Sequence, residues 1–96
     1  MGEEDEVIPL HATHISVHES VKFIRTRTFQ GHANIVEVIC HEGVEKIEFA
    51  AFCNCYSLRR FIMPGVTFVE DNSFWCCKAL TDVECGKLEL VGNANR

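Results

Sequence analysis

Cysteine and histidine side chains recur at a fixed spacing in this 96-residue chain. Cys55 and Cys77 lie 22 residues apart, His32 lies 23 residues before Cys55, and Cys53 and Cys76 are close to them in sequence. Thiolates and imidazoles are the usual protein ligands of Zn²⁺, and neighbouring thiols can also form a disulfide in an oxidising compartment. The two cysteine pairs lack the C-x₂-C spacing of common zinc sites. We therefore predict no metal site and no cofactor, and interpret Cys55 and Cys77 as small buried side chains.

Histidines form the second set of chemically capable residues. His14 and His18 have the H-x-x-x-H spacing that binds metal on a helix, and His18-Glu19 recurs as His41-Glu42. The segment around His14 is predicted to be a strand, and the glutamate of helical zinc proteases is missing, so we interpret these histidines as surface residues. No nucleophile–base arrangement or glycine-rich phosphate loop stands out, and we predict that the protein is not an enzyme.

An internal repeat positions both sets of residues. Residues 44–65 and 66–85 match at a constant offset of 22, and residues 21–43 match 44–65 at an offset of 23. The extra residue falls in the turn around Glu42, where an insertion costs little. Self-similarity at this period is typical of solenoids. We predict an acidic tail at 1–11 and a repeat domain at 12–96, with full repeats at 21–43, 44–65 and 66–87 and partial repeats at 12–20 and 88–96.

Each repeat contains two apolar segments that differ in the spacing of their apolar residues. Phe61 and Met63 have the every-second-residue spacing of a strand, and residues 44–47 form a second, shorter segment. Between them Phe52, Cys55 and Leu58 recur every third residue, which predicts one tight helical turn, α or 3₁₀. A unit of this kind buries its apolar face only by stacking on copies of itself. The predicted fold class is an α/β solenoid with short parallel strands on one side and helical turns and irregular coil on the other.

The combined pattern V-x-x-I-x-x-x-A-F-x-x-C-x-x-L-x-x-F-x-M-P resembles the BspA-like (Treponema-type) leucine-rich repeat. It is carried by Val44, Ile47, Ala51, Phe52, Cys55, Leu58, Phe61, Met63 and Pro64. The following copy has Ser73 at the Ala position and Gly86 at the Pro position, and the preceding copy has His32 at the Cys position. The resemblance implies a curved leucine-rich-repeat solenoid with a parallel sheet on its concave face, and a role in recognising proteins or surfaces.

In such a solenoid the outward side chains of successive strands form columns about 4.8 Å apart. Opposite charges in the first column would stabilise the strand register, which is one interpretation of them, while exposed isoleucines in the second would form a small apolar patch. The first column reads His14, Glu37, Arg60 and Asp82, and the second reads Ser16, Ile39, Ile62 and Glu84. We predict that a partner contacts the concave face at Glu37, Ile39, Arg60, Ile62, Asp82 and Glu84.

Composition narrows the classes of partner. The chain has nine basic and fourteen acidic side chains, a net charge of −5, which argues against binding of nucleic acid. No apolar run approaches the roughly 20 residues of a membrane span, so no membrane partner is predicted. The acidic N-terminus does not resemble a signal peptide, which predicts a cytoplasmic protein with reduced thiols.

Three functions follow from these patterns. The first is a non-enzymatic module that binds a protein partner through the concave face. The second is a structural segment of a longer repeat protein, because the C-terminal residues Gly-Asn-Ala-Asn-Arg make a weak cap, and open solenoid ends would favour homo-oligomers. The third is a Cys/His metal-binding or redox module.

Overall fold

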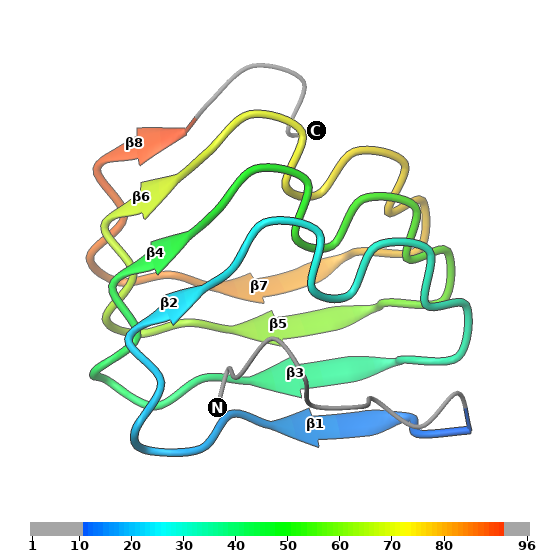
Figure 1. Cartoon of the computed structure of the whole chain (residues 1–96), viewed down its shortest axis with the longest axis horizontal. Helices are drawn as coiled ribbons and strands as arrows, with labels where there is room; N and C mark the ends of the chain where they lie inside the picture. The colour runs from blue at the N-terminus through cyan, green and yellow to red at the C-terminus, as the bar shows by residue number, and fades with distance from the viewer. Residues whose placement is uncertain (1–10, 92–96) are drawn as a thin grey trace.

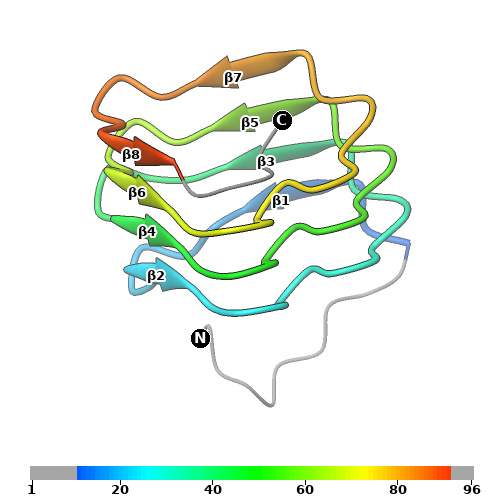
Figure 2. The ribbon, with the colours of Figure 1, turned by 90° about the horizontal axis from the view of Figure 1, so that it is seen from above.

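The computed structural model describes residues 11–91, which form a coil of short parallel strands (Figures 1 and 2). Tail residues 1–10 and residues 92–96 of the last partial repeat lie outside this range, so the predicted domain boundaries stay a prediction. The strands of the described part are β1 (His14–Ser16), β2 (Phe23–Ile24), β3 (Glu37–Ile39), β4 (Lys46–Ile47), β5 (Arg60–Ile62), β6 (Phe68–Val69), β7 (Asp82–Glu84) and β8 (Leu90–Val91).

These strands form two sheets, and each turn of the coil contributes one strand to each sheet. The odd-strand sheet has the order β1-β3-β5-β7, and the even-strand sheet has the order β2-β4-β6-β8. All pairings are parallel, and Figure 2 shows the turns stacked directly on one another. The predicted solenoid of parallel strands is confirmed. The even-strand sheet was not predicted as a sheet, because two-residue strands leave no alternating pattern in the sequence.

Stacked phenylalanine rings fill the centre of the coil. Phe29, Phe52 and Phe74 occupy the same position in successive turns, with centroids 4.9 Å and 5.6 Å apart and nearly parallel planes. Phe61, from β5, meets Phe52 and Phe74 edge-on at 4.8 Å and 4.9 Å. Offset-stacked and edge-on pairs each contribute about 0.5–1.5 kcal/mol beyond their buried area. Because the stacked rings come from successive turns, each turn buries its apolar face against the turns on either side of it.

The segment between the sheets folds as a chain of β-turns. The N–H groups of Ala51, Cys53 and Cys55 bond the carbonyl three residues back, whereas those of Phe52 and Asn54 bond the next turn of the coil. Such alternation cannot continue as a helix, because a helix needs consecutive intrasegment bonds. The described residues contain no helix, so the helical turn and the α/β part of the predicted fold class are not confirmed.

Left-handed residues produce this alternation at equivalent positions of each turn. They are Arg27 and Gly31, Ala50 and Asn54, and Asn72 and Cys76, with φ between 56° and 75°. Glycine and asparagine adopt this conformation readily, but other L-residues do so at a cost of roughly 1–2 kcal/mol. The repeat spacing alone does not reveal these positions, since only some of them carry glycine or asparagine.

Gly65 packs directly against the backbone of the preceding turn. A Cβ atom at this position would lie 2.0 Å from the carbonyl oxygen of Glu42 in the preceding turn. Gly86, in the corresponding turn of the following coil, has no atom within 4 Å of such a Cβ. Position 65 therefore requires glycine, because any side chain there would collide with the backbone of Glu42.

Candidate partner-binding face

The strand register brings the six predicted site residues together on the odd-strand sheet. Glu37 pairs with Arg60 and Arg60 with Asp82, while the second column joins Ile39, Ile62 and Glu84. Both columns project from β3, β5 and β7, and the residues between them point into the core, where Val38 and Phe61 are buried. At the edge strand β7 the inward residue Val83 is still 41% exposed. The core beneath this face is therefore fully covered at β3 and β5 and partly open at β7.

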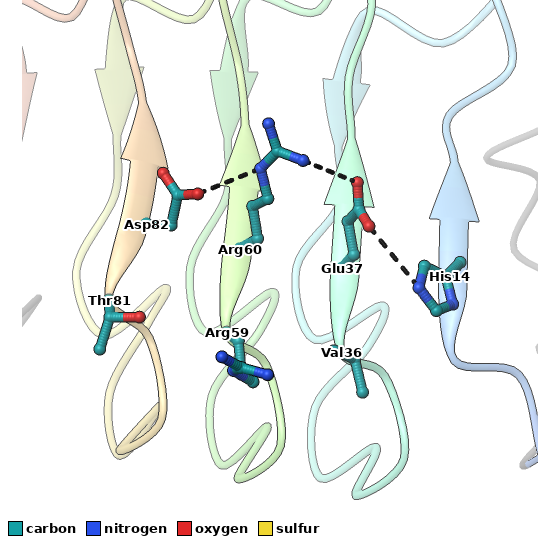
Figure 3. A pocket seen from close by; sticks show the side chains of 7 residues that line it. All are labelled: His14, Val36, Glu37, Arg59, Arg60, Thr81 and Asp82. Carbon is teal, nitrogen blue, oxygen red and sulfur yellow. Dashed lines mark ion pairs between the residues drawn. The ribbon is translucent and has the colours of Figure 1, made fainter.

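Arg60 is the centre of an ion-pair network on this face (Figure 3). Its Nε atom lies 3.2 Å from Oδ2 of Asp82, and its two terminal nitrogens lie 3.6 Å from carboxylate oxygens of Glu37 and Glu84. The other carboxylate oxygen of Glu37 is 3.6 Å from Nε2 of His14. One guanidinium thus joins strands β3, β5 and β7. Each exposed pair contributes about 0–1 kcal/mol, so the network orders side chains more than it stabilises the fold.

A shallow hollow of about 310 Å³ lies over the same strands. Figure 3 shows Val36, Arg59 and Thr81 at the start of the strands and the charged network further along them. The lining residues are His14, Val36, Glu37, Arg59, Arg60, Thr81 and Asp82. An open hollow of this kind suits a side chain of a partner better than an enclosed small molecule, because pockets for small molecules bury most of the ligand.

An apolar pair lies beside the charged network. Ile39 is 41% exposed and Ile62 is half-buried, and the two are direct neighbours on β3 and β5. Glu84 continues the same column on β7. The face therefore combines a small apolar patch with a carboxylate at its edge.

Comparison with known proteins identifies the repeat. Residues 10–94 match the family model described as “BspA type Leucine rich repeat region (6 copies)”. The chain belongs to the BspA-type leucine-rich repeat family. Neither the curated proteins nor the solved structures that were searched contain a match. Leucine-rich repeat solenoids are generally protein-interaction modules and typically not enzymes, which agrees with an interaction surface on the odd-strand sheet.

The recurring cysteine position of these BspA-type repeats has a structural role. The Cys55 thiol donates a hydrogen bond to the Phe29 carbonyl at 3.0 Å, and the Cys77 thiol donates one to the Phe52 carbonyl at the same distance. Each thiol therefore links its turn to the ring stack of the preceding turn. The neighbouring Cys77 thiol and burial both raise the pKa of Cys55, so its thiolate is disfavoured as a nucleophile or metal ligand.

His32 is buried in the same position of the first BspA-type repeat, and its Nδ1 accepts a 3.4 Å hydrogen bond from the Asn34 N–H. Among residues 11–91 no three His, Cys, Asp or Glu side chains are grouped closely enough to hold a metal ion. The geometry of the described residues therefore gives the zinc alternative no support.

The His41 side chain links one turn of the solenoid to the preceding turn by hydrogen bonding. Its Nδ1 accepts a hydrogen bond from the Gly43 N–H at 2.9 Å, and its Nε2 lies 3.0 Å from the carbonyl oxygens of His18 and Val21. Both ring nitrogens therefore contact backbone groups, one within its own turn and one in the preceding turn. The repeat pattern relates His41 to His18 in the preceding turn but does not reveal this backbone contact.

Sequence reasoning also missed the outward face of the even-strand sheet. Phe23, Lys46 and Phe68 form one column there, and the Lys46 ammonium lies 5.5 Å from the centre of the Phe68 ring. Glu48 and Glu70 accept hydrogen bonds from backbone N–H groups of the preceding turn, at Thr26 and Phe49. The charges of this face are largely engaged within the repeat. This face could have been predicted from the repeat, because Phe23, Lys46 and Phe68 are separated by 23 and 22 residues and therefore occupy equivalent positions in successive turns.

Within residues 11–91 there is no helix of the length and apolar character that a membrane crossing demands. Trp75, predicted on the convex side, is about half exposed in the chain of β-turns, away from both sheets.

Proposed function

We propose that this chain is a non-enzymatic interaction module that binds a protein partner through the outward face of the odd-strand sheet. The contact residues are Glu37, Ile39, Arg60, Ile62, Asp82 and Glu84. The observation that carries the proposal is the apolar pair of exposed Ile39 and half-buried Ile62 beside a rim of charged groups. An apolar centre with a polar rim is the usual composition of protein interfaces.

Rigidity of the face supports the same function. Each of its strands is hydrogen-bonded to its neighbours, and the ladder continues one residue past β3 and β5, where the N–H groups of Cys40 and Met63 bond the adjacent turn. Arg60 holds three carboxylates in place across the strands. A surface ordered before binding loses little conformational entropy when a partner arrives.

A paired substitution tests the proposal. Ile62→Asp places a charge in the apolar pair, and Phe68→Asp makes an equivalent change on β6 of the even-strand sheet in the same turn of the coil. Proteins captured from a lysate of the source cells by the wild-type chain should be lost with Ile62→Asp and kept with Phe68→Asp. Far-ultraviolet circular dichroism checks that both variants fold. Equal loss, or loss with Phe68→Asp alone, contradicts the proposal.

The alternative function is a structural segment of a longer repeat protein without a partner of its own. The exposed Val83 on edge strand β7 is the observation that favours it, because another turn or a second copy would cover this side chain. Sedimentation separates the two arrangements, since association of copies through the open ends depends on concentration. A cytoplasmic location stays a prediction.

A further inference from the structure

Carboxylates outnumber cations around Arg60 on the odd-strand face. Three carboxylates, of Glu37, Asp82 and Glu84, approach the single guanidinium of Arg60 within 3.6 Å. Their exposure differs, because the Glu37 side chain is 20% exposed whereas those of Asp82 and Glu84 are 56% and 61% exposed. Arg60 is surrounded by its own carboxylates, and the oxygens left facing solvent belong to β7. This part of the face therefore has unneutralised negative charge.

A second cation, Arg59, lies where the strands begin and lines the hollow there together with Glu37 and Asp82. Arg59 precedes β5, and its carbonyl oxygen accepts hydrogen bonds from Thr81 and Asp82 at the start of β7. Glu84 is the last residue of β7, two positions beyond Asp82. Glu37, Arg60 and Asp82 are the first residues of their strands and lie at the same end as Arg59, whereas Glu84 is an exposed carboxylate at the opposite end of this face.

The apolar pair and the carboxylates follow one another in a single row across the strands. Ile39, Ile62 and Glu84 are direct neighbours on β3, β5 and β7. With strands about 4.8 Å apart, the centre of the isoleucine pair lies roughly 7 Å from the Glu84 column. Two residues of an extended chain span about 6.6 Å and place their side chains on the same side. An extended segment lying across the strands would therefore match this row with residues i and i+2.

We infer that the partner of the odd-strand face docks an extended segment in which an apolar residue and a lysine or arginine are two positions apart. The apolar side chain packs on Ile39 and Ile62, and the cation pairs with the exposed carboxylate of Glu84, next in the same row and close to Asp82. This inference rests on the proposed function and adds the chemistry of the partner. Complementary charge raises the association rate and selects the orientation of the segment, and it makes binding weaker at high salt.

A random dodecapeptide library displayed on phage, selected on the wild-type chain, tests the inference. Enriched peptides should contain an apolar residue and Lys or Arg at positions i and i+2 in either order. Synthetic copies, measured by fluorescence polarisation, should bind the double variant Asp82→Asn, Glu84→Gln at least about fivefold more weakly, the effect of one or two exposed ion pairs. Glu45→Gln, an exposed charge away from this face, is the matched control and should change binding less than twofold.

The outcomes distinguish the inference from the proposed function. Peptides that depend on Ile62 but show no basic enrichment and bind the Asp82, Glu84 double variant normally overturn the inference and leave the proposed function standing. Peptides that bind Ile62→Asp as well as wild type overturn both. Enrichment of acidic peptides, or of none, counts against the inference, whereas loss of binding in 0.5 M salt together with basic enrichment supports it.

Discussion

Replacement of Gly65 by alanine is the sharpest test of how the turns of this solenoid are stacked. The new Cβ would lie 2.0 Å from the carbonyl oxygen, 2.8 Å from the carbonyl carbon and 3.2 Å from the Cα atom of Glu42. Non-bonded heavy atoms settle near 3.5 Å, so the two turns must separate by more than about 1 Å at this point. The obstructing atoms are backbone, and a side-chain rotation cannot relieve the contact.

The expected cost of Gly65→Ala is about 3 kcal/mol, at the upper end of the range for overpacked sites. For a chain of this size that loss lowers the melting temperature by roughly 12–24 °C. Chemical unfolding in urea, followed by far-ultraviolet circular dichroism, gives the free energy of unfolding directly. The measurement applies to the isolated chain and needs no partner.

Gly86→Ala is the matched control, because nothing lies within 4 Å of its Cβ and its backbone is not left-handed. Both variants gain the same restriction of the unfolded chain, which favours alanine by about 0.4–1 kcal/mol. The difference between them therefore isolates the contact with Glu42. Urea midpoints that agree for the two variants would refute the stacking derived from Gly65.

Three further predictions concern the core and the turns. Phe52→Leu should destabilise the chain by about 1–3 kcal/mol more than Phe29→Leu, because Phe52 contacts three rings and Phe29 one in the described core; equal urea midpoints would contradict this. Ala50→Gly should be about 1–2 kcal/mol more stable than Ala51→Gly, since both lose a buried methyl but only Ala50 is left-handed; the reverse order in urea would be inconsistent. Burial raises the pKa of Cys40 to about 12 from an ordinary 9.0. The unfolded chain therefore releases this proton first, and the urea midpoint should fall as pH rises above about 9, less steeply in Cys40→Ala.

The repeat in the sequence was enough to predict the strands of the odd-strand sheet. An offset of 22 or 23 residues aligns Glu37, Arg60 and Asp82, and the structure pairs these residues as direct neighbours. Alternation around Phe61 separates buried from outward side chains, as it does in any strand. The period therefore predicted which residues are neighbours on adjacent strands and which of them point outward, because each turn repeats the geometry of the preceding one.

Periodicity did not reveal the backbone conformation between the sheets. The three-residue spacing of Phe52, Cys55 and Leu58 suits a helical turn equally well, but left-handed Ala50 and Asn54 direct alternate N–H groups to the next turn. The sequence does not mark Ala50 as a left-handed residue, because alanine rarely adopts positive φ. The role of Arg60 was also predicted only in part. The repeat placed Arg60 between two acidic residues of the first column, but it did not show that Glu84 of the second column also reaches the guanidinium.

The most direct test of the odd-strand face as the binding surface is a residue-resolved map of the contact. Uniformly ¹⁵N-labelled protein is titrated with a peptide selected on the wild-type chain, and amide chemical shifts are followed in solution. The account predicts that the largest shifts fall on β3, β5 and β7, centred on Ile39, Ile62 and Glu84. Shifts centred on β4 and β6, or on the turns around Trp75, would contradict it.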